Sequence, residues 1–114
     1  MGPSANTTSD PAYEQVLSTL TRYAHDDWLG VEILARSVRE CFDHRPSYAE
    51  ARPLAIRAVS DLINAGAEAG DIAEEGFRPW LLSRPEMIDR ITRGLEERDT
   101  WPEPNELGWL TFPE

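Results

Sequence analysis

The chain has 114 residues, of which 40% are hydrophobic, and its 21 acidic and 11 basic residues give a formal net charge of −10. This length fits one domain, the apolar content excludes a wholly disordered chain, and no apolar run approaches the about 20 residues that cross a membrane. The negative charge opposes binding to nucleic acid or to an anionic membrane, and it favours basic protein partners.

The first residues, MGPSANTTSD, are small and polar and lack the basic and apolar regions of a secretory signal. We expect residues 1–10 to form a flexible N-terminal tail and residues 11–114 to form a single domain. Cys41 is the only cysteine, which excludes an internal disulfide. A cytoplasmic location is therefore the default expectation.

A first helix is predicted to begin at Asp10-Pro11, because a carboxylate caps the free backbone N–H groups and proline is tolerated in the first turn. Apolar residues at helical spacing continue it for about 14 residues. They are Tyr13, Val16, Leu17, Leu20, Tyr23 and Ala24.

His25-Asp26-Asp27 interrupts this pattern. We expect Asp26 and Asp27 to lie at the start of a second helix, where carboxylates stabilise the positive end of the helix dipole. This helix runs to about Asp43, and Trp28-Leu29 forms either its beginning or a very short strand. The predicted buried face consists of Val31, Leu34, Val38, Cys41 and Phe42.

Ser47 and Glu50 have the spacing of a capping box, in which each side chain binds the other residue's backbone N–H. Pro53 lacks the N–H that a helix interior uses, which predicts a short turn over 48–52 and a main third helix over 53–65. Gly66 is expected to end this helix. Its predicted inner face consists of Ala55, Ile56, Val59, Leu62 and Ile63.

Two short strands are predicted over 67–73 and 77–82, joined at Glu74-Glu75-Gly76, with Pro79 at an edge or at the end of pairing. A second capping box, Ser83 with Glu86, predicts a fourth helix. After a proline-rich linker, residues 107–112 read as a strand that joins the hairpin sheet.

The order of three helices and a hairpin over residues 13–82 resembles a winged-helix domain. The predicted fold class is therefore α+β, winged-helix-like, with three helices, a β-hairpin, a fourth helix and a C-terminal strand. The resemblance implies that the third helix reads the DNA major groove and that the hairpin is the wing. The candidate nucleic-acid-binding residues on or near that helix are Arg45, Arg52, Arg57 and Asn64.

The charges of the hairpin oppose this use. Residues 58–77 contain five acidic residues and no basic one, so that phosphate is repelled from the predicted wing. Residues 36–57 hold five arginines against three acidic residues, which makes a small basic patch only if the arginines converge. The candidate partner-binding acids are Asp61, Glu68, Asp71, Glu74 and Glu75, with a second group of Glu96, Glu97 and Asp99.

Catalytic and metal-binding patterns are incomplete. His25, Asp26 and Asp27 lack a second ligand cluster at matching spacing, and helix capping explains them better than a metal does. Cys41 and His44 stand three residues apart, but Cys41 falls on an apolar stripe and no third catalytic group accompanies them. We predict no enzyme activity, no metal and no cofactor. Most of Trp28, Trp80, Trp101 and Trp109 are expected in the core, and any exposed pair becomes an interface candidate.

The predicted function is a non-enzymatic acidic module that binds a basic protein. A concrete form is an immunity or antitoxin inhibitor of a nucleic-acid-directed partner. The alternative is a winged-helix transcriptional regulator that binds DNA through the arginines. Residue pattern does not specify the oligomeric state.

Overall fold

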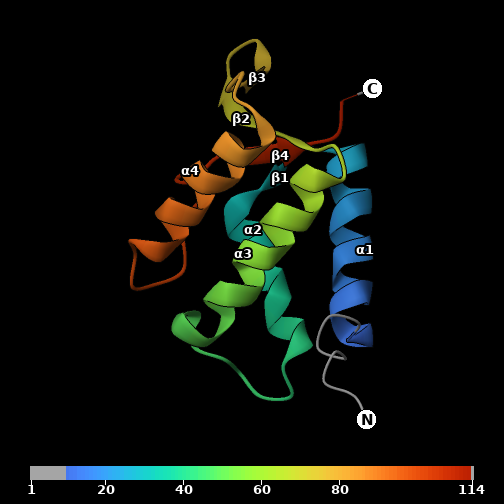
Figure 1. The fold of residues 1–114 in the computed structure, drawn as a ribbon, viewed down its shortest axis with the longest axis vertical. Helices are drawn as coiled ribbons and strands as arrows, with labels where there is room; N and C mark the ends of the chain where they lie inside the picture. Colours follow the sequence, from blue (N-terminus) through green and yellow to red (C-terminus); the bar gives the residue numbers. More distant parts are fainter. Residues whose placement is uncertain (1–9, 114) are drawn as a thin grey trace.

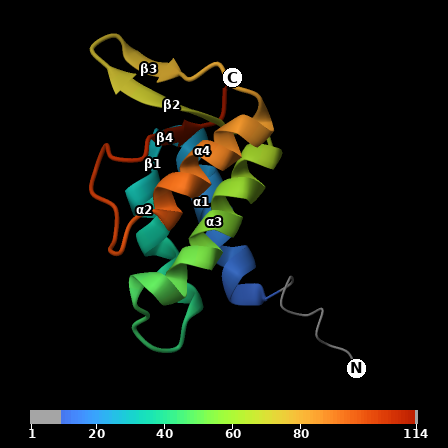
Figure 2. The same cartoon turned by 60° about the vertical axis from the view of Figure 1, so that its left-hand side comes forward.

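The structure is a computed structural model that describes residues 10–113. Within this range the chain forms four α-helices and a four-stranded antiparallel sheet, which confirms the α+β class. The helices run side by side, and the sheet lies across one end of them (Figure 1, Figure 2). Of the predicted tail, only Asp10 lies within the described residues, and it belongs to the folded domain as a helix cap.

Helix α1 (Pro11–Asp26) begins as predicted. The Asp10 carboxylate accepts a hydrogen bond of 2.9 Å from the Ala12 N–H, and Pro11 occupies the first turn. The helix has 16 residues and buries one face against the other helices. Tyr23, which the periodicity places on that face, is 38% exposed. The residues of α1 that are buried are Tyr13, Val16, Leu20 and Ala24.

The predicted role of Asp26 and Asp27 at the start of a second helix is wrong. Helix α1 continues through Asp26, and the Asp27 carboxylate accepts a hydrogen bond of 2.7 Å from the next backbone N–H. Strand β1 (Leu29–Gly30) follows, so that the short strand left open by the sequence is present. The helix that begins at Val31 has no side-chain cap. Instead, the Val31 N–H donates to the Gly108 carbonyl at 3.1 Å.

Helix α2 (Val31–Ser37) is shorter than predicted and continues as a 3-10 helix over Val38–Cys41. The Ser37 hydroxyl donates to the Ile33 carbonyl at 2.8 Å, and such back-bonding competes with the regular ladder of a helix. Val38 is buried and Cys41 is half-buried.

Helix α3 (Tyr48–Asn64) is one continuous helix, so the predicted break at Pro53 is wrong. Its start is the predicted capping box, with Ser47 and Glu50 bonding each other's N–H at 2.9 and 3.1 Å. Pro53 removes only the bond to the carbonyl of Ala49. Both residues are exposed, and water can replace that bond at small cost.

The end of α3 follows the predicted glycine signal. Gly66 has a φ of 118°, which a residue with a side chain rarely adopts. The Gly66 N–H donates to the Ile63 carbonyl and the Ala67 N–H donates to the Leu62 carbonyl, both at 3.0 Å. This pair of bonds is a Schellman motif, and it turns the chain directly into the sheet.

Strands β2 (Glu68–Ala73) and β3 (Gly76–Pro79) form the predicted hairpin. Strand β3 ends at Pro79 on the sheet edge, three residues earlier than predicted. The Trp80 N–H adds one further bond to β2, at the Ala69 carbonyl, and a φ of 61° at Leu81 then turns the chain out of the sheet.

Strand β4 (Trp109–Thr111) lies between β1 and β2, giving the order β1-β4-β2-β3. The sequence predicted that this strand joins the hairpin, and β4 pairs with β2 and also with β1. Leu110 stands opposite Leu29 on one side and Ala69 on the other, and all three are fully buried. The last strand therefore joins the N-terminal half of the domain to the hairpin.

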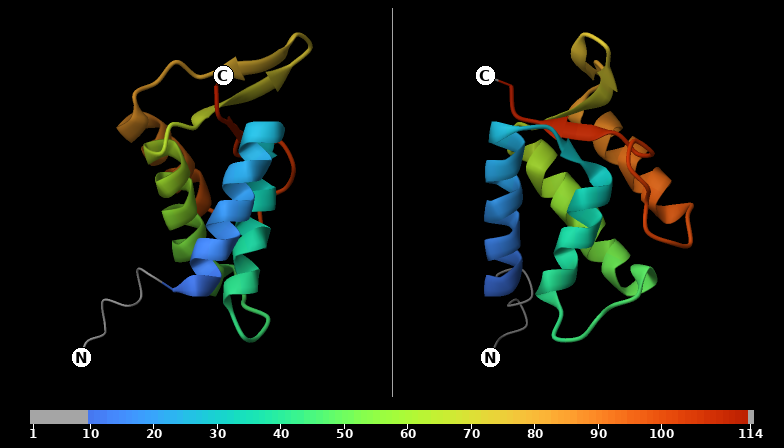
Figure 3. Two further views of the ribbon diagram at one scale, coloured as in Figure 1. Left: turned by 90° about the vertical axis from the view of Figure 1, so that its right-hand side faces the viewer. Right: turned by 180° about the vertical axis from the view of Figure 1, so that it is seen from behind.

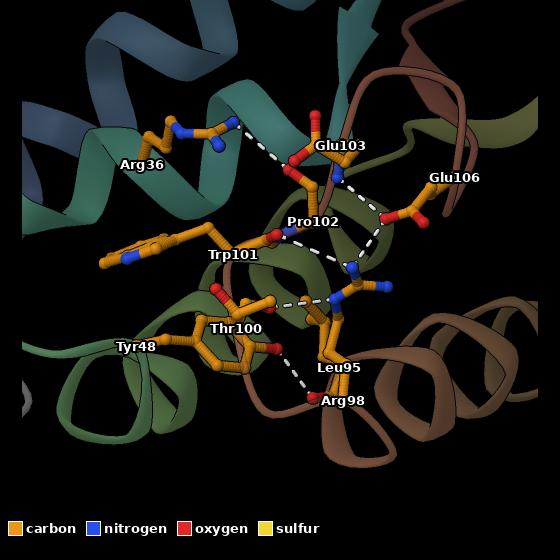
Figure 4. Close-up of polar contacts among 9 residues, drawn as sticks. All are labelled: Arg36, Tyr48, Leu95, Arg98, Thr100, Trp101, Pro102, Glu103 and Glu106. Atoms are coloured by element: carbon orange, nitrogen blue, oxygen red, sulfur yellow. Dashed lines mark hydrogen bonds and ion pairs between the residues drawn. The ribbon is translucent and has the colours of Figure 1, made fainter.

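Helix α4 (Arg84–Glu96) begins with the predicted capping box of Ser83 and Glu86 and packs along α3. Arg98 organises the linker that follows, as Figure 4 shows. Its Nε donates to the Thr100 carbonyl at 2.9 Å. Its Nη2 donates to the Trp101 carbonyl at 3.5 Å and pairs with the Glu106 carboxylate at 2.6 Å. These contacts return the chain from the end of α4 to the sheet.

The core lies between the helices and the inner face of the sheet. Within residues 10–113, Glu32 is the one charged residue that is buried there, with 8% of its surface exposed. Among the described residues, none of the helices has the length and hydropathy to cross a membrane. The largest fully buried side chains include Tyr13, Leu29, Leu34, Leu62, Ile63, Ile91, Leu95 and Leu110.

Candidate acidic docking site

Two acidic pairs that are far apart in the sequence flank one tertiary contact at a corner of the molecule. The ring of Trp28 lies against Gly76, where an added Cβ would come within 3.8 Å of it. Asp26-Asp27 precede the tryptophan, and Glu74-Glu75 precede the glycine. The left panel of Figure 3 shows the hairpin extending above the end of α1. We call Asp26, Asp27, Trp28, Glu74 and Glu75 the acidic corner.

All five residues of the acidic corner are exposed, and Trp28 is 39% exposed. Glu75 pairs with Arg78 at 2.5 Å, and this hydrogen bond lowers the pKa of Glu75 from its ordinary value. Among the described residues, neither Asp26 nor Glu74 has a side-chain partner. Arg78 neutralises one of the four carboxylates, and Arg22 lines a second shallow pocket together with Asp26 and Asp27.

A shallow groove of about 280 Å³ runs beside Trp28. One wall is the His25 ring, which stacks on Phe112 with their centroids 4.1 Å apart. Asp26 and Asp27 form its rim. An aromatic wall with a carboxylate rim suits a guanidinium or ammonium group, which can contact the ring face and pair with the acid.

Of the other predicted acids, Asp71 on the hairpin and Asp61 on α3 already have hydrogen-bond partners. The Asp71 carboxylate accepts a hydrogen bond of 3.0 Å from the Trp80 indole, and Glu68 is half-buried opposite Thr111. Asp61 accepts a hydrogen bond of 2.6 Å from the Tyr13 hydroxyl. The Asp71 and Asp61 carboxylates therefore each have a structural role in addition to their negative charge.

The second predicted acidic group lies elsewhere. Glu96, Glu97 and Asp99 are exposed at the C-terminal end of α4, whereas the start of that helix lies at the sheet. A helix of 13 residues is about 20 Å long. The eight predicted acids therefore do not form one surface.

The predicted basic residues do not converge either. Arg52 donates to the Arg98 carbonyl beyond α4 at 3.3 Å, whereas the Arg57 guanidinium lies 4.2 Å from the Tyr13 ring on α1. The two arginines therefore face opposite flanks of α3. Arg45 is exposed in the loop before α3, and Asn64 is exposed at its far end.

No hydrogen bond joins Cys41 to His44 among the described residues. Burial raises the pKa of the Cys41 thiol, and the charges of Asp10 and Glu40 add to the effect. Hydrogen bonds with Asp43 and Glu50 raise the pKa of the His44 imidazole. Within residues 10–113, no group of three histidine, cysteine, aspartate or glutamate side chains is placed to hold a metal ion.

The tryptophans correct a prediction, because none of the four is fully buried. Trp80 and Trp101 pack partly against the core, while the Trp109 indole donates to Asn105 at 3.0 Å. Trp28 is the most exposed of the described tryptophans and belongs to the acidic corner.

Sequence reasoning missed the acidic corner as a unit. It treated Asp26 and Asp27 as helix caps and Glu74-Glu75 as part of a separate wing. The sequence feature that could have located the acidic corner is the short strand after Trp28, because a strand there places Trp28 beside the sheet. Comparison with family models, with curated proteins and with solved structures finds no match to this chain.

Proposed function

We propose that this chain is a non-enzymatic protein-binding module, winged-helix-like in the passage from α3 to the hairpin, whose acidic corner docks a basic surface of a partner. The observation that supports this is an exposed tryptophan packed against the hairpin turn, with an exposed acidic pair next to each of the two contacting residues in the sequence. The carboxylates steer a basic surface into place, and the indole face contacts an arginine or lysine.

A concrete form of this function is a cytoplasmic inhibitor of the immunity or antitoxin kind. A nucleic-acid-directed partner needs a positive surface for phosphate, and an acidic protein competes for the same charges. The hairpin carries Asp71, Glu74 and Glu75, and Arg52 and Arg57 face opposite flanks of α3. Both features favour a protein partner over DNA.

The experiment compares proteins retained by the immobilised chain from nuclease-treated lysate of its source. The test variant replaces Asp26 and Asp27 by asparagine and Glu74 and Glu75 by glutamine. The control neutralises the same number of acids at the other end of α4, at Glu96, Glu97, Asp99 and Glu103.

We expect wild type and control to retain a basic protein that the test variant loses. With the purified partner, Trp28→Ala should weaken binding about tenfold or more. Failure of wild type to retain any basic protein at low salt would contradict the proposal. Equal loss in test and control variants would indicate a general charge effect without a specific site.

A further inference from the structure

Leu81 has two unusual properties for a leucine. It is 88% exposed, far more than any other large apolar residue within the described range. Its φ of 61° lies in the left-handed region, which leucine rarely adopts. Its neighbours Trp80 and Leu82 both pack partly against the core, so that the left-handed turn between them sends the Leu81 side chain to solvent. Backbone strain of this kind is typical of contact sites.

Arg84, three residues further on, is also placed without benefit to the monomer. It is exposed and occupies the first position of α4, where the helix dipole is positive and repels a guanidinium. Among the described residues it has no ion pair and no ring contact. An exposed apolar side chain and an unneutralised cation therefore lie within about 11 Å of each other along the chain.

The segment that holds these two residues has a net positive charge, although the whole chain carries −10. Residues 78–93 contain four arginines and two acidic residues. Both acids are engaged, because Asp89 is ion-paired within α4 at 3.0 Å and Glu86 belongs to the capping box. Arg84 and Arg90 have no carboxylate partner in the part of the chain that the structure describes. The segment thus offers two free cations and no free carboxylate.

A shallow groove of about 440 Å³ adjoins this segment, between the end of α3 and the start of α4. The connection that holds Leu81 and these two helix ends lie at the same edge of the molecule (Figure 3, left panel). We call Leu81, Arg84 and the groove the basic edge. The groove has a mainly apolar lining, and its residues are Asn64, Pro85, Ile88, Asp89 and Thr92.

We propose that the basic edge docks an acidic segment of a partner protein, with an apolar side chain of that segment in the groove against Leu81 and a carboxylate on Arg84. Charge complementarity determines this choice of partner. A guanidinium forms its strongest contacts with carboxylates, and the negative charge of the other surfaces directs an acidic segment to this edge. The contact involves no residue of the acidic corner and is independent of the proposed docking function.

Other occupants fit the charges less well. A second copy of the chain, related by a two-fold axis, would set two positive segments against each other. Nucleic acid and an anionic membrane present negative charge over a much larger area, so that the net charge of −10 repels them.

The first test selects peptides from a random library displayed on phage, in parallel on the immobilised full chain and on the double variant Leu81→Asn, Arg84→Gln. We expect the peptides that wild type enriches over the variant to be acidic and to contain an apolar residue. Basic peptides that dock on the acidic corner are retained by both proteins and cancel. The absence of any peptide that prefers wild type, or a preference for neutral or basic peptides, would overturn the proposal.

The second test measures the affinity of the most enriched peptide by fluorescence anisotropy. Leu81→Asn and Arg84→Gln should each weaken binding at least about tenfold, and so should Thr92→Arg, which places a charged side chain in the groove. Leu81→Asn should not lower the melting temperature, because asparagine tolerates a positive φ. The matched control is Arg22→Gln with Tyr23→Asn, which removes an exposed arginine and an exposed ring from α1. Equal losses in the control and in the basic-edge variants would also overturn the proposal.

Two measurements on the chain without peptide test the other occupants. Analytical ultracentrifugation over a micromolar dilution series tests a second copy, and cosedimentation with phosphatidylserine vesicles tests a lipid surface. We expect a monomer that does not bind the vesicles. A dimer or vesicle binding that Leu81→Asn abolishes would assign the basic edge to that occupant and overturn the proposal. Far-ultraviolet circular dichroism verifies that each variant is folded.

Discussion

At the scale of single residues, the structure gives several polar side chains of the surface an internal role. Tyr13 is 1% exposed, and its hydroxyl donates to the Asp61 carboxylate at 2.6 Å. Arg57 lies over the same ring and pairs with the same carboxylate at 3.8 Å. Burial, followed by the bond to Asp61, raises the pKa of Tyr13 from its ordinary value. Asp61 therefore joins α3 to α1.

We predict that Tyr13→Phe lowers the free energy of unfolding by about 1–2 kcal/mol, because it removes a hydrogen bond to a charged acceptor that is partly exposed. Chemical denaturation measures the change. Tyr23→Phe is the matched control, since Tyr23 is exposed and its hydroxyl has no bond within the described residues. Its expected effect is under about 0.5 kcal/mol. Equal effects of the two variants would contradict the role of the bond.

At the scale of elements, α3 and α4 begin with the same device. In each, a serine and a glutamate three residues later bond each other's backbone N–H. These bonds lower the pKa of Glu50 and of Glu86 below the value of 4.5 that is usual for glutamate. A carboxyl whose pKa is lowered by folding stabilises the folded state above its unfolded pKa, and this stabilisation is lost as pH falls through the folded pKa.

We predict that acidification from neutral pH to below 4.5 lowers the melting temperature of the double variant Glu50→Gln, Glu86→Gln less than that of wild type. Glutamine makes the same capping bond without titrating. Glu96→Gln with Glu97→Gln removes two exposed carboxylates whose side chains make no capping bond, and this variant should lose as much melting temperature as wild type over the same pH range. If the capping variant remained as acid-sensitive as wild type, the two caps would not contribute to acid sensitivity.

At the scale of the whole molecule, the charge of −10 is spread over both ends of the fold, at the acidic corner and at the end of α4. In the sequence, most of these carboxylates are closer to another carboxylate than to an arginine. Self-repulsion of this kind destabilises the compact state, and salt reduces it.

We predict that the melting temperature rises as sodium chloride increases from a few millimolar to about 0.1 M, where the screening length is about 10 Å. Differential scanning calorimetry measures the shift. The variant with the acidic corner neutralised, which carries four fewer charges, should show a smaller rise. A melting temperature that falls with salt would mean that attractive ion pairs outweigh the repulsion.

Much of the architecture could be predicted from sequence, and the failures have physical causes. The Asp10 cap, both capping boxes, the Gly66 stop and the hairpin turn are confirmed, because each depends on residues within about five positions. The break at Pro53 was wrong because an early turn on an exposed face tolerates the lost bond. Asp26 and Asp27 were misplaced because capping chemistry alone does not distinguish the end of one helix from the start of the next.

The sequence by itself determined the α+β class, the helix-to-hairpin passage at Gly66 and the acidity of the hairpin. Only the tertiary structure decided that β4 lies between β1 and β2, and that Trp28 packs against Gly76 in the hairpin. The tertiary structure also decided that Arg52 and Arg57 lie on opposite flanks of α3 and that the Leu81 side chain is exposed to solvent. These features depend on contacts between residues far apart in the chain, whose pairing leaves no periodic or local signal in the sequence.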